Sequence, residues 1–191
     1  MNKTLKSGRG ALVSLLVLLS VLVTVRAASA TVVVALELGE MARDAATIVR
    51  GRVVAVDSRW TDDRRGVETL VTLAVESALK GADAPDGSVT FRVPGGRLGR
   101  IRNIVVGAPQ FAVDEEVVVF LAHRGPSIPH VVGFNQGVYR IAARDGSLMV
   151  QPPVLDGTTM AGPVMRGDGT RRPIALQAFE QQVRTLAREG R

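Results

Sequence analysis

The sequence predicts a mainly β protein: a small closed OB-like β-barrel with a short N-terminal helix and a C-terminal amphipathic helix. Six or seven short segments rich in valine are separated by polar turns, as is typical of small barrels and sandwiches. Closing the sheet on itself would remove the edge strands that a chain without disulfides would otherwise expose. An apolar stripe at helical spacing near the C-terminus predicts a helix that covers an open end of the barrel.

Residues 1–30 have the three-part pattern of a secretory signal peptide. A cationic start precedes the 15-residue apolar run 11–25, and small residues end the segment at Ala30. The sequence therefore predicts an exported protein, periplasmic or secreted, with cleavage after Ala30. The alternative is an uncleaved membrane anchor, but a spanning helix needs about 20 apolar residues. We expect no stable membrane span after cleavage.

The charge balance depends on this N-terminal segment. The 191 residues carry 24 Lys and Arg against 18 Asp and Glu, a formal charge of +6. Four of the cations and none of the acids lie in the first 30 residues, so residues 31–191, interpreted as one domain, carry a net charge of +2. We expect no nucleic-acid partner for such a nearly neutral, exported domain. The absence of cysteine excludes lipidation, thiol catalysis and thiolate metal sites.

The sequence predicts a helix and a β-hairpin in the first half of the domain. Apolar residues at helical spacing indicate a short helix over 36–46. The valine-rich segment 48–56 predicts a strand in which Gly51 marks a bulge or a close contact. A polar turn over 61–66 leads to a second long strand over 69–79, in which apolar and polar residues alternate.

The middle of the chain combines two strands with an irregular segment. Residues 89–93 alternate as a third strand, and Pro94 ends it. Residues 95–110 contain four glycines and three arginines, and irregular connections of this length are often functional. The continuous apolar run 117–121 predicts a strand that is buried on both faces.

The sequence predicts short strands, a loop and a helix in the C-terminal third of the chain. The strands are expected over 131–132, 138–142 and 147–150, and the last two form a hairpin. Prolines and glycines indicate a loop through 151–173. The apolar residues at spacings of three and four then predict a helix over 174–188.

Several of these segments together resemble known proteins. They are the strand 49–56 with Ser58 and Trp60, the strand end Leu79-Lys80-Gly81, the Pro94-Gly95-Gly96 stop, the segment 107–111 and the run into Phe120-Leu121. Over residues 36–142 the chain is similar to a group of uncharacterised exported bacterial proteins. Its order also resembles the netrin-like OB-fold module of tissue inhibitors of metalloproteinases, which implies a netrin-like barrel. Those inhibitors chelate a metal through an N-terminal cysteine, so no inhibitory residue carries over to this chain.

The sequence lacks the patterns that indicate catalysis. No serine has a Gly-x-Ser-x-Gly context, and no His-Glu-x-x-His is present. His123 and His130 are interpreted as solvated loop histidines, and the acidic pairs 62–63 and 115–116 as solubilising turn charges. The glycine-rich segment 95–99 does not complete a phosphate-loop pattern. We therefore predict no catalytic residue, no cofactor and no metal ion.

A candidate binding surface is predicted at the irregular segment. The three guanidinium groups of Arg97, Arg100 and Arg102 suit a phosphate, sulfate or uronate through bidentate hydrogen bonds. An alternative interpretation is a solvated loop in a chain that prefers arginine to lysine. Trp60 and Phe111 complete the predicted surface.

The remaining aromatic side chains are assigned from the strand and helix patterns. Trp60, at a hairpin end, is expected to be a partly buried plug. Phe134 and Tyr139 are further candidates for surface platforms, because OB barrels bind ligands on exposed rings. The core-facing aromatic residues are expected to be Phe91, Phe120 and Phe179.

These observations predict an exported, non-enzymatic binding or accessory module. The expected partner is an extracytoplasmic protein, for example a secreted protease, or an anionic ligand. Two alternatives remain open from the sequence: a hydrolase whose site is assembled from scattered polar residues, and an envelope structural protein that self-associates.

Overall fold

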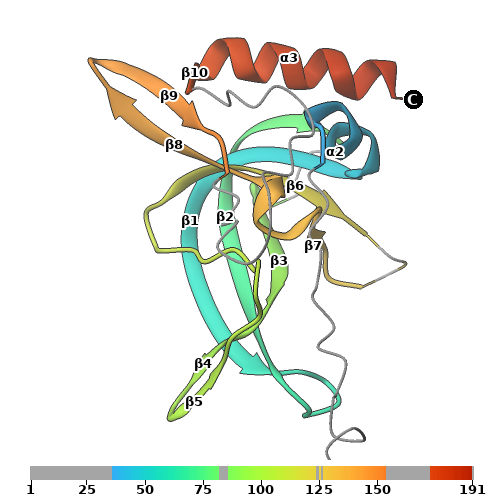
Figure 1. Cartoon of the computed structure of the whole chain (residues 1–191), viewed down its shortest axis with the longest axis vertical. Helices are drawn as coiled ribbons and strands as arrows, with labels where there is room; N and C mark the ends of the chain where they lie inside the picture. Colours follow the sequence, from blue (N-terminus) through green and yellow to red (C-terminus); the bar gives the residue numbers. More distant parts are fainter. Residues whose placement is uncertain (1–35, 82–85, 124, 126, 154–172, 191) are drawn as a thin grey trace, which may run out of the picture. The chain divides into compact units, whose positions relative to one another are not determined.

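The computed structural model describes residues 36–81, 86–123, 125, 127–153 and 173–190. The predicted signal peptide, its cleavage after Ala30 and most of the predicted loop 151–173 lie outside the described residues. The described part is mainly β, with a short α-helix near its start and a longer one at its end (Figure 1). Neither of these helices has the length and apolar content needed to cross a bilayer.

Most element bounds agree with the sequence prediction, but β1 extends beyond the predicted 48–56, and residues 174–175 of the predicted helix 174–188 form a short strand instead. The helices are α2 (Leu38–Asp44), the 3-10 turn η1 (Phe134–Gly137) and α3 (Leu176–Glu189). The strands are β1 (Thr47–Trp60), β2 (Val67–Lys80), β3 (Ser88–Pro94), β4 (Gly96–Leu98), β5 (Ile101–Asn103), β6 (Glu116–Ala122), β7 (His130–Val131), β8 (Val138–Arg144), β9 (Ser147–Gln151) and β10 (Ile174–Ala175). The predicted helices, the long hairpin and the closing hairpin are therefore confirmed.

The strands pair in an order that the sequence does not reveal. The long strands β1 and β2 are antiparallel, and β3 follows β2 antiparallel. The short β7 pairs parallel with β3 and antiparallel with β6, and β6 pairs antiparallel with the first half of β1. From β6 the sheet continues through β8, β9 and β10, while β4 and β5 form a separate two-stranded ribbon.

Gly51 permits the close approach of β1 and β2. A Cβ atom at this position would lie 2.3 Å from the carbonyl oxygen of Ala74. The β1–β2 register also shifts between Arg50 and Gly51, and such a bulge bends a strand and increases its twist. The prediction of a bulge or close contact at Gly51 is confirmed.

The central strand β6 separates two apolar clusters. Val118 and Phe120 pack with α2 and α3, whereas Val117, Val119 and Leu121 pack with β1, β2 and β3. All five side chains are completely buried, as predicted for a strand covered on both faces. Each such side chain contributes about 1.5–3 kcal/mol through apolar burial, so β6 anchors both halves of the core.

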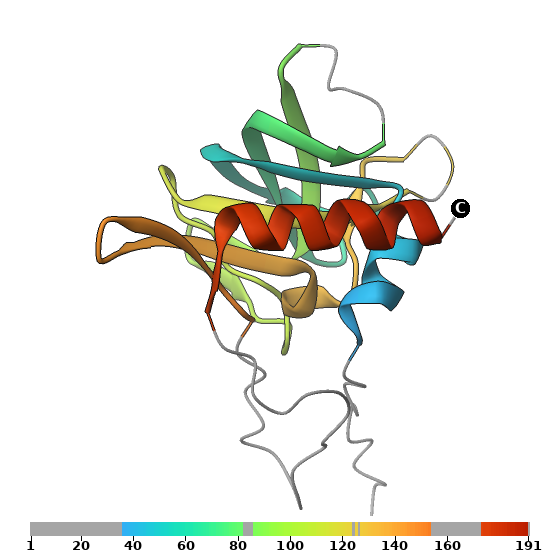
Figure 2. The ribbon, with the colours of Figure 1, turned by 90° about the horizontal axis from the view of Figure 1, so that it is seen from above.

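Helix α3 covers the first of these clusters. Leu176, Phe179 and Val183 are buried along one side of the helix, and Figure 2 shows α3 crossing the sheet with α2 beside its C-terminal end. Tyr139 packs against Phe179 in a tilted arrangement with ring centroids 4.7 Å apart, and it is only 6% exposed. The prediction of Tyr139 as a surface platform is wrong, because α3 covers this part of β8. Phe91, Phe120 and Phe179 are buried as predicted.

The acids at the start of β6 bridge elements and do not only solubilise a turn. Glu115 binds Arg140 at 2.6 Å, and Glu116 binds Arg50 at 2.9 Å. Both carboxylates are largely buried. The solubilising interpretation of this pair is therefore wrong, because strand pairing brings arginines from β1 and β8 to both acids. Asp62 and Asp63 do lie exposed in the β1–β2 turn.

Candidate functional site

A cavity of about 480 Å³ lies beside the β4–β5 ribbon, and we call it the ribbon cavity. Its walls come from β1, β2 and β3 on one side and from the segment 95–111 on the other. Figure 1 shows the ribbon at the end of the sheet opposite α3. The lining residues used below are Ser58, Thr69, Gly96, Arg97, Arg102, Ile104 and Phe111.

A chain of hydrogen bonds fixes the corner between β3 and β4. The backbone N–H of Arg97 donates to Ser58 Oγ at 3.2 Å, and Thr69 Oγ1 donates to the carbonyl oxygen of Gly95 at 2.8 Å. The two hydroxyl groups lie 3.1 Å apart, which leaves the Ser58 hydroxyl to donate to Thr69. Both hydroxyl groups are thus engaged in holding the backbone of the corner.

Gly96 is required where the backbone passes over these hydroxyl groups. Its φ is +146°, and a Cβ atom would lie 2.3 Å from Thr69 Oγ1 and 2.6 Å from Ser58 Oγ. The glycine therefore sets the depth at which β4 enters the cavity wall.

The segment predicted as an irregular loop contains an ordered hairpin. Gly96 to Leu98 pairs with Ile101 to Asn103, and Gly99, with a φ of +60°, begins the turn between the strands. The prediction missed these strands because each has three residues and no alternating pattern that identifies a strand.

The hairpin places two of the three predicted arginines at the ribbon cavity and the third in its turn. Arg97 and Arg102 lie directly opposite each other in the register, and both line the ribbon cavity. Arg100 is exposed in the turn and does not line it. The structure therefore brings two of the three predicted arginines to the ribbon cavity, because the turn carries Arg100 away from the wall.

The two predicted aromatic residues have different positions. Phe111 lines the cavity, and its ring meets Phe91 edge-on at a centroid distance of 5.4 Å. It is a half-buried wall attached to the core rather than an open platform. Trp60, at the end of β1, is 42% exposed and does not line the ribbon cavity. Trp60 is thus partly buried at a hairpin end, as expected, but the structure leaves it outside the ribbon cavity.

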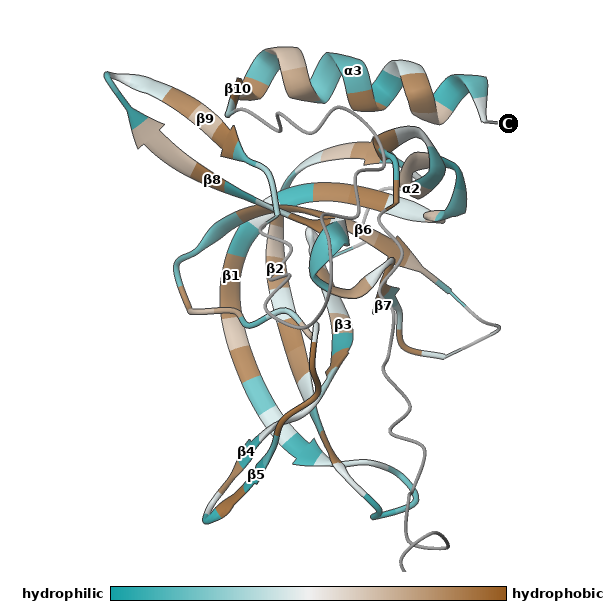
Figure 3. Cartoon of the chain, viewed as in Figure 1, coloured by the Kyte–Doolittle hydropathy of each residue, from teal (hydrophilic) through white to brown (hydrophobic). Residues whose placement is uncertain are grey.

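An apolar rim that the sequence analysis did not predict borders the cavity. Ile104, which lines the cavity, is 69% exposed, and Val106, which follows the lining residue Val105, is 85% exposed. Hydrophobic residues continue from β5 into the segment that follows it (Figure 3). The run Ile104-Val105-Val106 was the available signal, but its exposure depends on the hairpin that precedes it.

A second cavity of about 710 Å³ lies next to the first, and we call it the histidine cavity. Its lining includes His123, His130 and the buried Glu68, whose carboxylate binds Arg59 at 2.8 Å. His123 is exposed, but His130 lies in β7 and is partly buried. The interpretation of His130 as a solvated loop residue is wrong, because β7 pairs with both β3 and β6. Within the described residues, no group of three His, Asp or Glu side chains is placed to hold a metal ion.

The geometry gives the ribbon cavity the features of a binding site. It combines two arginines, a half-buried aromatic wall and an exposed apolar rim on a rigid corner. No protein-family model, no curated protein and no solved structure matches this chain.

Proposed function

We propose that this chain is an exported, non-enzymatic binding module that holds a segment of an extracytoplasmic partner protein in the ribbon cavity. Export is supported by the signal-peptide pattern of residues 1–30. We further propose that the sheet is an OB-like, netrin-like barrel. Its support is the pairing order, which runs from β1 through β2, β3, β7 and β6 and returns to β1.

The observation that carries the binding proposal is the exposed apolar rim beside the ribbon cavity. Ile104 and Val106 are large apolar side chains with most of their surface in water. Exposed apolar patches with polar neighbours are typical of protein interaction sites. Fully enclosed pockets suit small ligands, whereas exposed residues border the ribbon cavity and leave room for a segment of a larger partner.

The experiment uses the absence of cysteine in the chain. Val106→Cys introduces a single attachment point for a photo-crosslinker at the rim. Leu148→Cys is the matched control, because Leu148 is also exposed but lies on β9. Both labelled proteins are irradiated with the extracytoplasmic fraction of the source cells, and adducts are separated by mass.

We expect a discrete adduct from the Val106→Cys protein and none from the Leu148→Cys protein. Adding Ile104→Ser should reduce the yield, because it removes part of the apolar rim. Equal adducts from both cysteine positions, or no adduct at position 106, would contradict the proposed function.

A further inference from the structure

We propose that Arg97 and Arg102 together bind a carboxylate group of an acidic partner segment, and that apolar side chains beside this carboxylate occupy the ribbon cavity. This inference rests on the proposed binding function and specifies the chemistry of the partner. It assigns no role in binding to Arg100.

The first argument is the register of the ribbon. Arg97 and Arg102 are direct cross-strand partners, so their side chains leave the same face of the two-stranded ribbon. Like charges directly opposite each other destabilise a strand pair. An anion between the two guanidinium groups would convert this repulsion into two attractions.

The second argument is the charge environment of the ribbon. All three arginines of β1 form ion pairs with glutamate: Arg50 and Arg52 with Glu76 and Glu116, and Arg59 with Glu68. Arg97 and Arg102 form no ion pair with any carboxylate in the described part of the chain. The Arg97 side chain donates from Nε to the carbonyl oxygen of Gly99 at 3.4 Å, which is a long hydrogen bond within the turn. Both guanidinium groups therefore keep donors available for a partner.

The third argument is the geometry of the donors. A guanidinium group is planar and presents paired N–H donors that match the two oxygens of a carboxylate. The corner that carries Arg97 is held by its own N–H bond to Ser58 Oγ at 3.2 Å, and Gly96 beside it has no room for a side chain. The arginine backbone is thus fixed in place before a ligand arrives, which lowers the entropic cost of binding.

The surroundings favour a protein segment over a lipid surface. Recognition of anionic membranes generally uses a cluster of 4–8 cations, whereas the ribbon carries three arginines. Asn103 at the end of β5 also lies against Gly66, in the turn that carries the exposed Asp62 and Asp63. The same turn also carries the exposed Arg64 and Arg65, so it adds no net charge beside the three arginines of the ribbon.

The same surroundings favour a carboxylate with apolar neighbours over a free inorganic anion. Phe111 and Val93 form an apolar wall in the cavity, and Ile104 extends this wall to the rim. A small anion would leave this apolar surface in water. A glutamate or aspartate flanked by apolar residues would cover it.

The test follows the arginine side-chain N–H resonances by NMR in the purified exported protein. The probes are the blocked peptide acetyl-Leu-Glu-Leu-amide, its Gln counterpart, inorganic phosphate and phosphatidylglycerol vesicles. We expect saturable shifts of the Arg97 and Arg102 Nε–H signals with the Glu peptide. We expect the Gln peptide to bind about tenfold more weakly, because it lacks the charge-assisted hydrogen bonds.

Three variants locate the effect. Arg97→Gln and Arg102→Gln should each weaken binding of the Glu peptide about tenfold, whereas Arg100→Gln should leave it unchanged. Thermal unfolding should show that neither cavity variant is less stable than the unchanged protein, since neither arginine has an ion pair to lose. An Arg100→Gln effect as large as that of Arg102→Gln would mean diffuse charge attraction and would overturn the inference.

The Gln peptide, inorganic phosphate and the vesicles test whether the site is specific for a carboxylate of a protein segment. Equal binding of the Glu and Gln peptides, or no binding of either, would overturn the carboxylate assignment. Phosphate that binds as tightly as the Glu peptide would show a site for free oxyanions, and tight vesicle binding would show a membrane site. Either result would overturn the assignment of an acidic protein segment.

A failure of this inference can be separated from a failure of the proposed function. The cross-linking experiment is repeated with Val106→Cys in a protein that also carries Arg97→Gln and Arg102→Gln. Loss of the adduct supports the inference. An undiminished adduct would leave the binding function in place and overturn the role of the arginines.

Discussion

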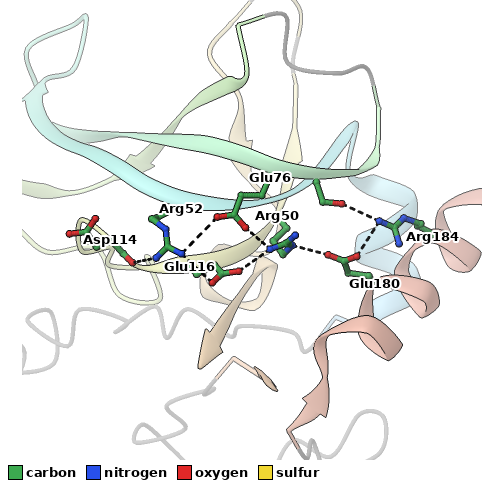
Figure 4. A network of polar contacts seen from close by, with 8 residues as sticks. Arg50, Arg52, Glu76, Asp114, Glu116, Glu180 and Arg184 are labelled. Carbon is green, nitrogen blue, oxygen red and sulfur yellow. Dashed lines mark hydrogen bonds and ion pairs between the residues drawn. The ribbon is translucent and has the colours of Figure 1, made fainter. Parts of the chain in front are cut away.

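Arg50 on β1 donates a hydrogen bond from Nε to Glu180 Oε1 on α3 at 2.9 Å, across 130 positions of the chain. The same guanidinium group also binds Glu76 on β2 and Glu116 on β6 (Figure 4). Burial lowers the pKa of Arg50, but the hydrogen bond to Glu116 and the charges of Glu180 and Glu76 together raise it above its ordinary value. Arg50 therefore remains charged and joins three strands to the covering helix.

Removing Arg50 is expected to destabilise the fold. Arg50→Ala leaves Glu116 and Glu180, each only 14% exposed, without their shared cation. We expect a loss of about 1–3 kcal/mol in the free energy of unfolding, between the values for exposed and buried pairs. Urea denaturation measures this loss.

Arg65→Ala is the control, because Arg65 is 88% exposed and lies 4.0 Å from its acid; its effect should stay within about 0.5 kcal/mol. A pKa that is raised in the folded protein means that Arg50 contributes stability at every pH below its ordinary pKa. Arg50 therefore stays charged between about pH 7 and 10. The difference in the free energy of unfolding between the unchanged protein and Arg50→Ala should not fall in this range through deprotonation of Arg50. Equal stability of the two proteins at pH 7 would contradict the role of Arg50.

The two glycines of the ribbon should respond differently to alanine. Gly96→Ala places a Cβ atom against the hydroxyl groups of Ser58 and Thr69, so we expect a loss of about 2 kcal/mol or more. Gly99 also has a positive φ but has open space around it, and Gly99→Ala should cost about 1 kcal/mol. Chemical denaturation compares the two variants, and equal losses would show that contact with the hydroxyl groups is unimportant.

The β1–β2 turn should show a perturbed carboxyl group. A hydrogen bond from the Thr61 hydroxyl, followed by one from the backbone N–H of Arg65, lowers the pKa of Asp63 below 3.8. Because the pKa of Asp63 is lowered in the folded protein, its ionised carboxyl group stabilises the turn at pH values above the ordinary pKa. This contribution is lost as the pH falls through the pKa of the folded state. An NMR titration of the Asp63 carboxyl carbon measures the shift.

Thr61→Val provides the comparison for this titration. It removes the larger of the two hydrogen bonds, so the pKa of Asp63 should rise toward 3.8. An unchanged titration curve in Thr61→Val would contradict the assigned cause.

The exported protein should begin at Thr31. Cleavage after Ala30 follows from the small residues at the end of the signal-peptide pattern. Intact-mass spectrometry of the protein recovered outside the cytoplasm gives its N-terminus directly. A mass that includes Met1 would contradict cleavage and favour the membrane-anchor alternative.

Local patterns predicted most elements of this fold. The spacing of Leu176, Phe179 and Val183 identified α3 and its buried side, because a helix repeats its faces every 3.6 residues. The uninterrupted run in β6 identified a strand buried on both faces, since neither face carries a polar residue. Gly51 was recognised because a glycine inside a strand indicates a bulge or close contact.

The candidate site could be predicted only in part. Three arginines in a glycine-rich segment drew attention to the segment that lines the ribbon cavity, but their number suggested one cluster. The ribbon register selects Arg97 and Arg102 and excludes Arg100. Trp60 appeared to belong to the surface because it follows a strand, yet β1 ends outside the ribbon cavity.

The sequence by itself determined the mainly β class, the two helices and the region in which a partner surface was expected. These properties depend on periodicity and turn chemistry, which act over a few neighbouring residues. Only the tertiary structure decided that Arg50 meets Glu180, that α3 covers Tyr139 and that Arg97 faces Arg102. Strand register and helix docking join residues far apart in the chain, and no local spacing specifies which of many pairings buries the most apolar surface.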